Sequence, residues 1–90
     1  MSHAHAARRA AIRSAILRYL SRHPRASDAV AGICAWWLPE EGITAPTDLV
    51  DEVLETLVAQ QLIRRVRLAD GTLIYGSGDS DAVARRHHAT

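Results

Sequence analysis

The sequence predicts a small α+β fold, with three helices followed by a two-stranded β-hairpin. The first observation is the run 48–63, in which apolar residues recur at steps of three and four, the spacing of one buried helical face. The second is a change of pattern directly afterwards, to two short β-type runs at 64–68 and 72–75. Asp70-Gly71 lies between these runs and favours a hairpin with a type I′ turn, because Gly adopts positive φ at little cost.

The first helix is expected over residues 6–22, behind a polar segment 1–5 that is expected to be flexible. On a helical wheel its core face spans about 100°, and this face consists of Ile12, Ile16, Tyr19 and Leu20. A basic stripe lies on a different side and consists of Arg8, Arg18, Arg22 and Arg25. His23-Pro24 should end the helix, because a residue before proline is driven away from the α conformation.

A second helix is expected to begin at Ser27-Asp28, where the hydroxyl can cap the N-terminus and the carboxylate meets the positive end of the helix dipole. Its apolar face should consist of Val30, Ile33, Cys34, Trp37 and Leu38. Trp37 is therefore expected to be buried. Trp36 points about 100° away and should be more exposed, either as a lid on the edge of the core or as an exposed aromatic.

The sequence resembles a known family at the point where the third helix leads into the hairpin. The helix enters the hairpin 64–75 through Val53, Leu54, Leu57, Val58, Leu62 and Ile63. Over about residues 6–76 the chain resembles a winged helix-turn-helix domain. In DNA-binding members of this family the third helix enters the major groove, but the fold also serves as a dimerisation element or a protein-docking module. Residues 77–90 are expected to form a flexible tail.

The connection before the third helix is longer than this resemblance implies. Pro39 and Gly42 should end the second helix, and the connection then runs to about Pro46. Either Thr44 or Thr47 can cap the third helix. A helix-turn-helix normally uses a turn of about three to four residues. The longer connection therefore argues against a third helix that reads bases in the major groove of DNA.

The exposed side of the third helix also differs from that of DNA readers. Its acidic residues lie opposite the core face and are Asp48, Asp51, Glu52 and Glu55. No Arg or Lys occurs between Pro39 and Leu62, so this helix can neither neutralise a phosphate nor make the bidentate contact to guanine. The acidic face, with Trp36 as an apolar anchor, is therefore expected to bind a protein partner. A solvated face without a partner is the alternative.

Two other functions are compatible with the sequence. A DNA-binding regulator would contact the DNA backbone through arginines of the first helix and the wing, which are Arg8, Arg18, Arg22, Arg25, Arg64, Arg65 and Arg67. An accessory subunit of an enzyme would dock through the acidic surface instead. The basic and acidic stripes also favour a homodimer that weakens as salt is added.

No motif in the sequence indicates catalysis, a cofactor or a metal site. The residues His3, His5, His87 and His88 lie in the expected tails, and no HExxH or Cys-x-x-Cys spacing supplies a rigid ligand set. Cys34 is expected to be a small core residue, and as the single cysteine it excludes an internal disulfide. The chain is therefore expected to be a non-enzymatic protein of a reducing compartment, most simply the cytoplasm.

Composition limits the size of the fold but names no partner. Ninety residues fit one domain, with 48% hydrophobic residues, 23% charged residues and a formal net charge of +1. The longest apolar run, 29–38, is about half of a membrane-spanning length, so no membrane contact is expected. The segment 1–27 is basic and lacks acidic residues, as mitochondrial transit peptides do, but its helix is needed for packing.

Overall fold

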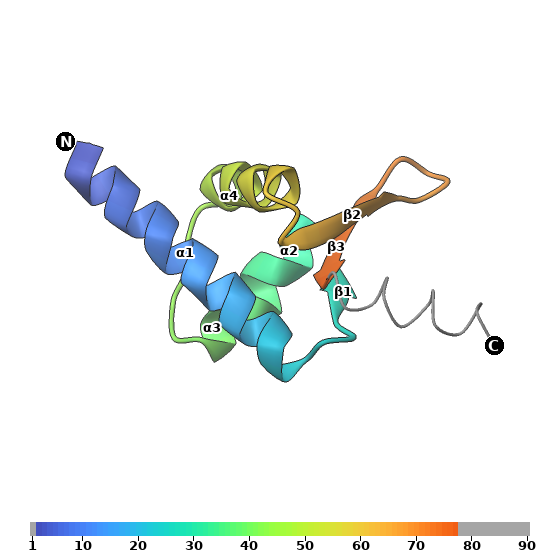
Figure 1. Cartoon of the computed structure of the whole chain (residues 1–90), viewed down its shortest axis with the longest axis horizontal. Helices are drawn as coiled ribbons and strands as arrows, with labels where there is room; N and C mark the ends of the chain where they lie inside the picture. Colours follow the sequence, from blue (N-terminus) through green and yellow to red (C-terminus); the bar gives the residue numbers. More distant parts are fainter. Residues whose placement is uncertain (1, 78–90) are drawn as a thin grey trace.

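The computed structural model describes residues 2–77, which form three helices and a three-stranded antiparallel sheet (Figure 1). The chain begins with α1 (Ser2–Arg22) and the short strand β1 (Ser27–Asp28). One uninterrupted helix, called the second helix below, follows and consists of α2 (Val30–Gly32), η1 (Ile33–Trp37) and α3 (Leu38–Glu40). The last elements are α4 (Thr47–Ala59), β2 (Ile63–Arg67) and β3 (Leu73–Ser77). The predicted α+β class is confirmed.

The strand β1 was not expected from the sequence. It pairs antiparallel with β3, so that the strand order is β1-β3-β2. Gly76 of β3 permits this pairing, because a Cβ at that position would lie 3.1 Å from the Ala26 carbonyl oxygen. The prediction that Ser27-Asp28 starts the second helix is therefore wrong. The helix starts at Val30 without a side-chain cap, and the Asp28 carboxylate accepts a hydrogen bond from the Ala29 N–H at 2.8 Å.

The hairpin loop is closed by a glycine bulge rather than by the expected type I′ turn. A type I′ turn needs positive φ at two residues, and in the loop only Gly71 has one, with φ of +91°. The Gly71 N–H donates to the Leu68 carbonyl at 2.9 Å, and the Leu68 N–H donates to the Thr72 carbonyl at 2.8 Å. Asp70 accepts from the Thr72 N–H at 2.9 Å, which lowers the pKa of Asp70. The loop thus has three residues, with Gly71 in the bulge position.

The core joins all three helices and the sheet, much as the apolar spacing predicts. From α1 and the second helix, it takes in Ile12, Ala15, Ile16, Leu20, Ile33, Trp37 and Leu38. From α4 and the sheet, it takes in Leu49, Val50, Val53, Leu54, Leu57, Ile63 and Tyr75. Tyr19 is half-buried at the edge of this core and stacks on the Trp37 ring, with centroids 4.8 Å apart.

Leu62 is the one residue of the predicted α4 face that the fold leaves outside, with 44% of its surface exposed. The helix ends at Ala59, and Gln61 adopts a left-handed conformation with φ of +62°. The Leu62 N–H then donates to the Leu57 carbonyl at 3.0 Å, which closes the helix and turns the chain. Ile63 enters the core in place of Leu62.

Several element boundaries also differ from the sequence expectations. Helix α1 begins at Ser2, earlier than the expected residue 6. Helix α4 begins at Thr47, with Pro46 at the N-cap and no side-chain cap, so neither threonine plays the expected capping role. Ser77, expected in the tail, is buried at the end of β3. The rest of the expected tail, 78–90, lies outside the described residues.

The two adjacent tryptophans have opposite environments, as predicted. Trp37 is 2% exposed and Trp36 is 69% exposed. Both lie in the π turn η1 (Ile33–Trp37), in which the Leu38 N–H donates to the Ile33 carbonyl. Trp37 keeps its place in the core beside Ile33 and Leu38.

Replacement of the two tryptophans should therefore have very different effects on stability. Trp37→Ala should lower the free energy of unfolding by about 3 to 5 kcal/mol, because it empties a packed site. Trp36→Ala should change it by less than about 0.5 kcal/mol. Urea unfolding followed by circular dichroism measures both. If Trp37→Ala had the same urea midpoint as wild type while Trp36→Ala was unfolded without urea, this result would contradict the packing of the two tryptophans.

Candidate functional site

The acidic residues of α4 lie on its exposed side, as predicted, but two of them have arginine partners within the chain. Glu52 forms an ion pair with Arg9 of α1. Glu55 forms an ion pair with Arg65 of β2, with 2.6 Å between Nη1 and Oε2. The other two, Asp48 and Asp51, are also exposed, and the Asp48 carboxylate accepts a hydrogen bond from the Leu49 N–H at 3.0 Å. The acidic face is therefore partly neutralised before any partner binds.

Arg65 connects this helix to the sheet beside the buried Tyr75. The hydrogen bond with Glu55 raises the pKa of Arg65, so this side chain stays cationic. Burial raises the pKa of Tyr75, and the negative charges of Asp51 and Glu55 add to this shift. The Tyr75 hydroxyl therefore stays protonated at neutral pH, and the Arg65–Glu55 contact holds the β2–β3 hairpin against α4.

The basic stripe of α1 is also engaged within the chain. Arg18 and Arg22 both contact the carboxylate of Glu41, and the Arg18 Nε lies 3.1 Å from Glu41 Oε1. The Glu41 side chain is only 5% exposed, although both arginines are about half exposed. Glu40 beside it contacts Arg22 at 3.9 Å and the His23 Nε2 at 3.0 Å.

Tyr19 completes this contact between α1 and the end of the second helix. Its ring stacks on Trp37 and also lies against His23, with centroids 4.4 Å apart. We call the set Arg18, Tyr19, Arg22, Trp37 and Glu41 the α1 clamp. The clamp uses arginines that the DNA-binding alternative needs for phosphates.

The remaining predicted cationic residues differ in their surroundings. Arg8, Arg25 and Arg67 are exposed and make no ion pair with other described residues. Arg64 is exposed and interacts with other residues of the chain. The arginines that the DNA-binding alternative needs are therefore not one surface. Arg18 and Arg22 belong to the clamp, Arg65 pairs with Glu55 of α4, and the others lie at separate positions. The basic and acidic stripes that favour a salt-sensitive homodimer do not pair with each other: Arg18 and Arg22 contact Glu41, and the acids of α4 that are paired contact other arginines.

Trp36 lies on an exposed side of the second helix, and the exposed residues of this side that precede Glu40 are all uncharged. The exposed residues of this side, which we call the Trp36 face, are Ala31, Ala35, Trp36 and Pro39. Trp36 makes no hydrogen bond and no ring contact with the described residues. The structure does not bring Trp36 into contact with the α4 acids, so the predicted surface is divided into two parts. The Trp36 face itself was not found from the sequence, because the π turn changes which residues are neighbours.

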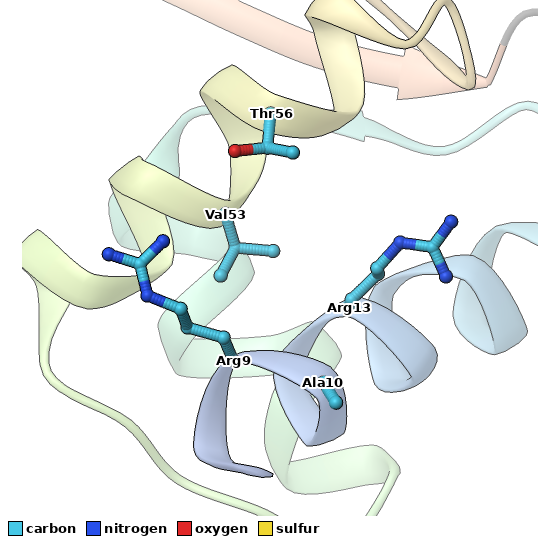
Figure 2. Close-up of a pocket in the computed structure, with 5 residues that line it drawn as sticks. All are labelled: Arg9, Ala10, Arg13, Val53 and Thr56. Atoms are coloured by element: carbon cyan, nitrogen blue, oxygen red, sulfur yellow. The ribbon is translucent and has the colours of Figure 1, made fainter. Parts of the chain in front are cut away.

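A shallow pocket of about 130 Å³ lies between α1 and α4. Figure 2 shows Arg9, Ala10 and Arg13 on the α1 side and Val53 and Thr56 on the α4 side. The Thr56 hydroxyl donates to the Glu52 backbone carbonyl at 3.2 Å. The lining contains no carboxylate, histidine or cysteine that could act as a base beside the Thr56 hydroxyl.

The described residues offer little other chemistry. Among them, no group of three or more His, Cys, Asp or Glu side chains is placed to hold a metal ion. Cys34 is a free thiol and half-buried. Over the same residues, no helix is both long enough and apolar enough to span a membrane.

Comparisons with protein-family models, with curated proteins and with solved structures give no match. The function must therefore be argued from these surfaces.

The α1 clamp makes a testable contribution to stability. Glu41→Gln should destabilise the fold by about 1.5 to 3 kcal/mol, because it weakens charged hydrogen bonds to a nearly buried carboxylate. Glu40→Gln is the matched control, since Glu40 is half exposed, and it should cost less than about 1 kcal/mol. Urea denaturation measures both variants. Equal effects of the two substitutions would show that the clamp does not hold α1.

Proposed function

We propose that this chain is a non-enzymatic winged-helix module that binds another protein through the Trp36 face. The winged-helix class is supported by the order of the elements, because the hairpin of β2 and β3 follows directly on the third helix, α4. It is also supported by the Arg65–Glu55 ion pair, which holds this hairpin against that helix. The proposed class leaves the function open, since this fold serves DNA binding, dimerisation and protein docking.

The exposure of Trp36 is the main observation that supports the proposal. A Trp side chain buries about 150 to 250 Å² in a contact, and 69% of Trp36 is exposed. Covering that part would contribute roughly 2.5 to 4 kcal/mol at about 25 cal/mol per Å². An exposed ion pair contributes about 0 to 1 kcal/mol. Trp36 therefore outweighs each single acidic residue as a source of affinity, and Trp is enriched among binding hot spots.

The acidic residues of α4 have a secondary part in this proposal. Glu52 and Glu55 would have to give up Arg9 and Arg65 before they met a basic partner, so they add little affinity. Asp48 and Asp51 make no ion pair among the described residues and remain exposed. Their charge would favour approach of a basic surface and disfavour approach of DNA.

The DNA-binding alternative has less support. Helix α4, the third helix of the proposed class, carries no cation, and Arg18, Arg22 and Arg65 are engaged in ion pairs. Nonspecific contact would rest on exposed positions such as Arg8, Arg25 and Arg67. An accessory subunit of an enzyme would use the same Trp36 face, and the identity of the bound protein decides between that role and an adaptor.

Site-specific cross-linking in the native cell tests the proposal. A photoreactive benzoylphenylalanine at position 36 should cross-link one predominant protein, because position 36 lies in the contact. The same group at Ser14, an exposed position on α1, is the control and should not capture that protein.

A second variant checks the energetic argument. Trp36→Ala should reduce co-purification of the captured protein by at least about tenfold, which corresponds to 1.4 kcal/mol, while its melting temperature stays that of wild type. Undiminished co-purification with Trp36→Ala, or equal cross-linking from positions 36 and 14, would refute the Trp36 face as the binding surface.

A further inference from the structure

Among residues 2–77, strand β2 has an open edge. In the strand order β1-β3-β2, β3 is central and β2 has a paired neighbour from this part of the chain on one side only. Its residues from Arg64 to Arg67 are all exposed. Figure 1 shows the loop end of the β2–β3 hairpin extending away from the helices. An edge of this kind presents unpaired backbone N–H and C=O groups that another strand can use.

The register identifies the backbone groups at this edge. The Leu68 N–H donates to the Thr72 carbonyl at the loop, which makes this a hydrogen-bonded pair. Pairs alternate along an antiparallel ladder, so Val66 faces Ile74 and Arg64 faces Gly76 in the same way. The N–H and C=O groups of Arg65 and Arg67 therefore point to the open edge.

The charges on β2 restrict which strand can pair there. Arg64, Arg65 and Arg67 all lie within this five-residue strand. Pairing of two copies of β2 would bring like charges opposite one another, which is destabilising. An acidic strand would be attracted to the same edge, so the arginines both block self-pairing and favour an acidic partner.

The two faces of β2 indicate the pattern of that partner. Arg65 and Arg67 lie on the face shared with Tyr75 and Leu73, and Arg65 already contacts Glu55. Arg67, which makes no ion pair with the described residues, is thus the cation available to an incoming carboxylate. The other face carries Val66, which is 46% exposed, and Arg64, which already interacts with other residues of the chain. The fitting segment has acidic residues on the Arg67 side and an apolar residue beside Val66.

We propose that the open edge of β2 adds an extended acidic segment of a partner protein as a fourth strand. In this mode backbone hydrogen bonds supply affinity, and alternate side chains supply specificity. The site is on a different element from the Trp36 face, and neither surface depends on the other. Failure of one proposal therefore leaves the other standing.

Peptide binding to the full chain tests this proposal. The probe is a short fluorescein-labelled peptide in which Glu and Val alternate, followed by fluorescence anisotropy at low salt. It should bind saturably. The same peptide with Lys in place of Glu, and the Glu peptide N-methylated at alternate residues, should each bind at least about tenfold more weakly, because they lose the charge and the backbone donors respectively.

Two substitutions of Arg67 distinguish the contribution of its charge to binding from that of its backbone N–H at the strand edge. Arg67→Gln removes only the charge and should weaken binding by a few-fold. Arg67→Pro also removes an N–H that points away from β3, which an edge strand tolerates, so the fold should persist by circular dichroism while binding falls further. Peptide binding by Arg67→Pro equal to that of Arg67→Gln would overturn the proposal.

Three further results, two with the peptides and one with DNA, would also overturn it. These are equal binding of the N-methylated peptide, absence of saturable binding of the Glu peptide, and tighter binding of a duplex DNA oligonucleotide that displaces the peptide. The last result would assign the β2 edge to nucleic acid.

Discussion

The nearly buried carboxylate of Glu41, held by Arg18 and Arg22, is the contact on which the arrangement of the helices depends. A carboxylate removed from water is costly unless it is paired, so this contact favours one position of α1 along the second helix. In that position Tyr19 stacks on Trp37 and closes the core over it. Because neighbouring residues of a helix point in different directions, burial of Trp37 leaves Trp36 facing solvent.

The same constraint determines which charges are available to a partner. Arginines of α1 are used against Glu41 and Glu52, and Arg65 is used against Glu55. A chain with a formal net charge of +1 in this way neutralises part of the charge of a basic and an acidic helix within itself. Besides the charges that stay exposed, it presents an exposed indole and an open strand edge. Both are suited to contacts with proteins.

The sequence predicts those parts of the fold in which apolar residues recur at a regular helical spacing. The α4 core face and the burial of Trp37 follow from apolar spacing alone, because many residues contribute to one phase. The strand β1 could not be predicted, since two residues show no alternation and depend on close approach to Gly76. Leu62 continues the helical spacing, yet the left-handed residue Gln61 redirects it to solvent.

The candidate site is harder to predict than the fold, because it depends on long-range pairing. The sequence shows the acids of α4 and the arginines of α1 and the hairpin, but not that Glu52 contacts Arg9 or that Glu55 contacts Arg65. It identifies Trp36 as a candidate anchor, and the structure shows how far the indole is exposed. The open edge of β2 follows only from the order of the strands, which the unexpected β1 completes.

Fluorine NMR of the chain labelled with 5-fluorotryptophan tests the central claim most directly, that Trp36 contacts a protein and not DNA. The chain has two tryptophans and so should give two resonances, which Trp36→Phe assigns. The account predicts that the protein fraction of the native cell shifts or broadens the Trp36 resonance and leaves that of Trp37 in place, while duplex DNA changes neither. A Trp36 resonance unmoved by protein, together with saturable and sequence-selective binding of DNA, would contradict the account.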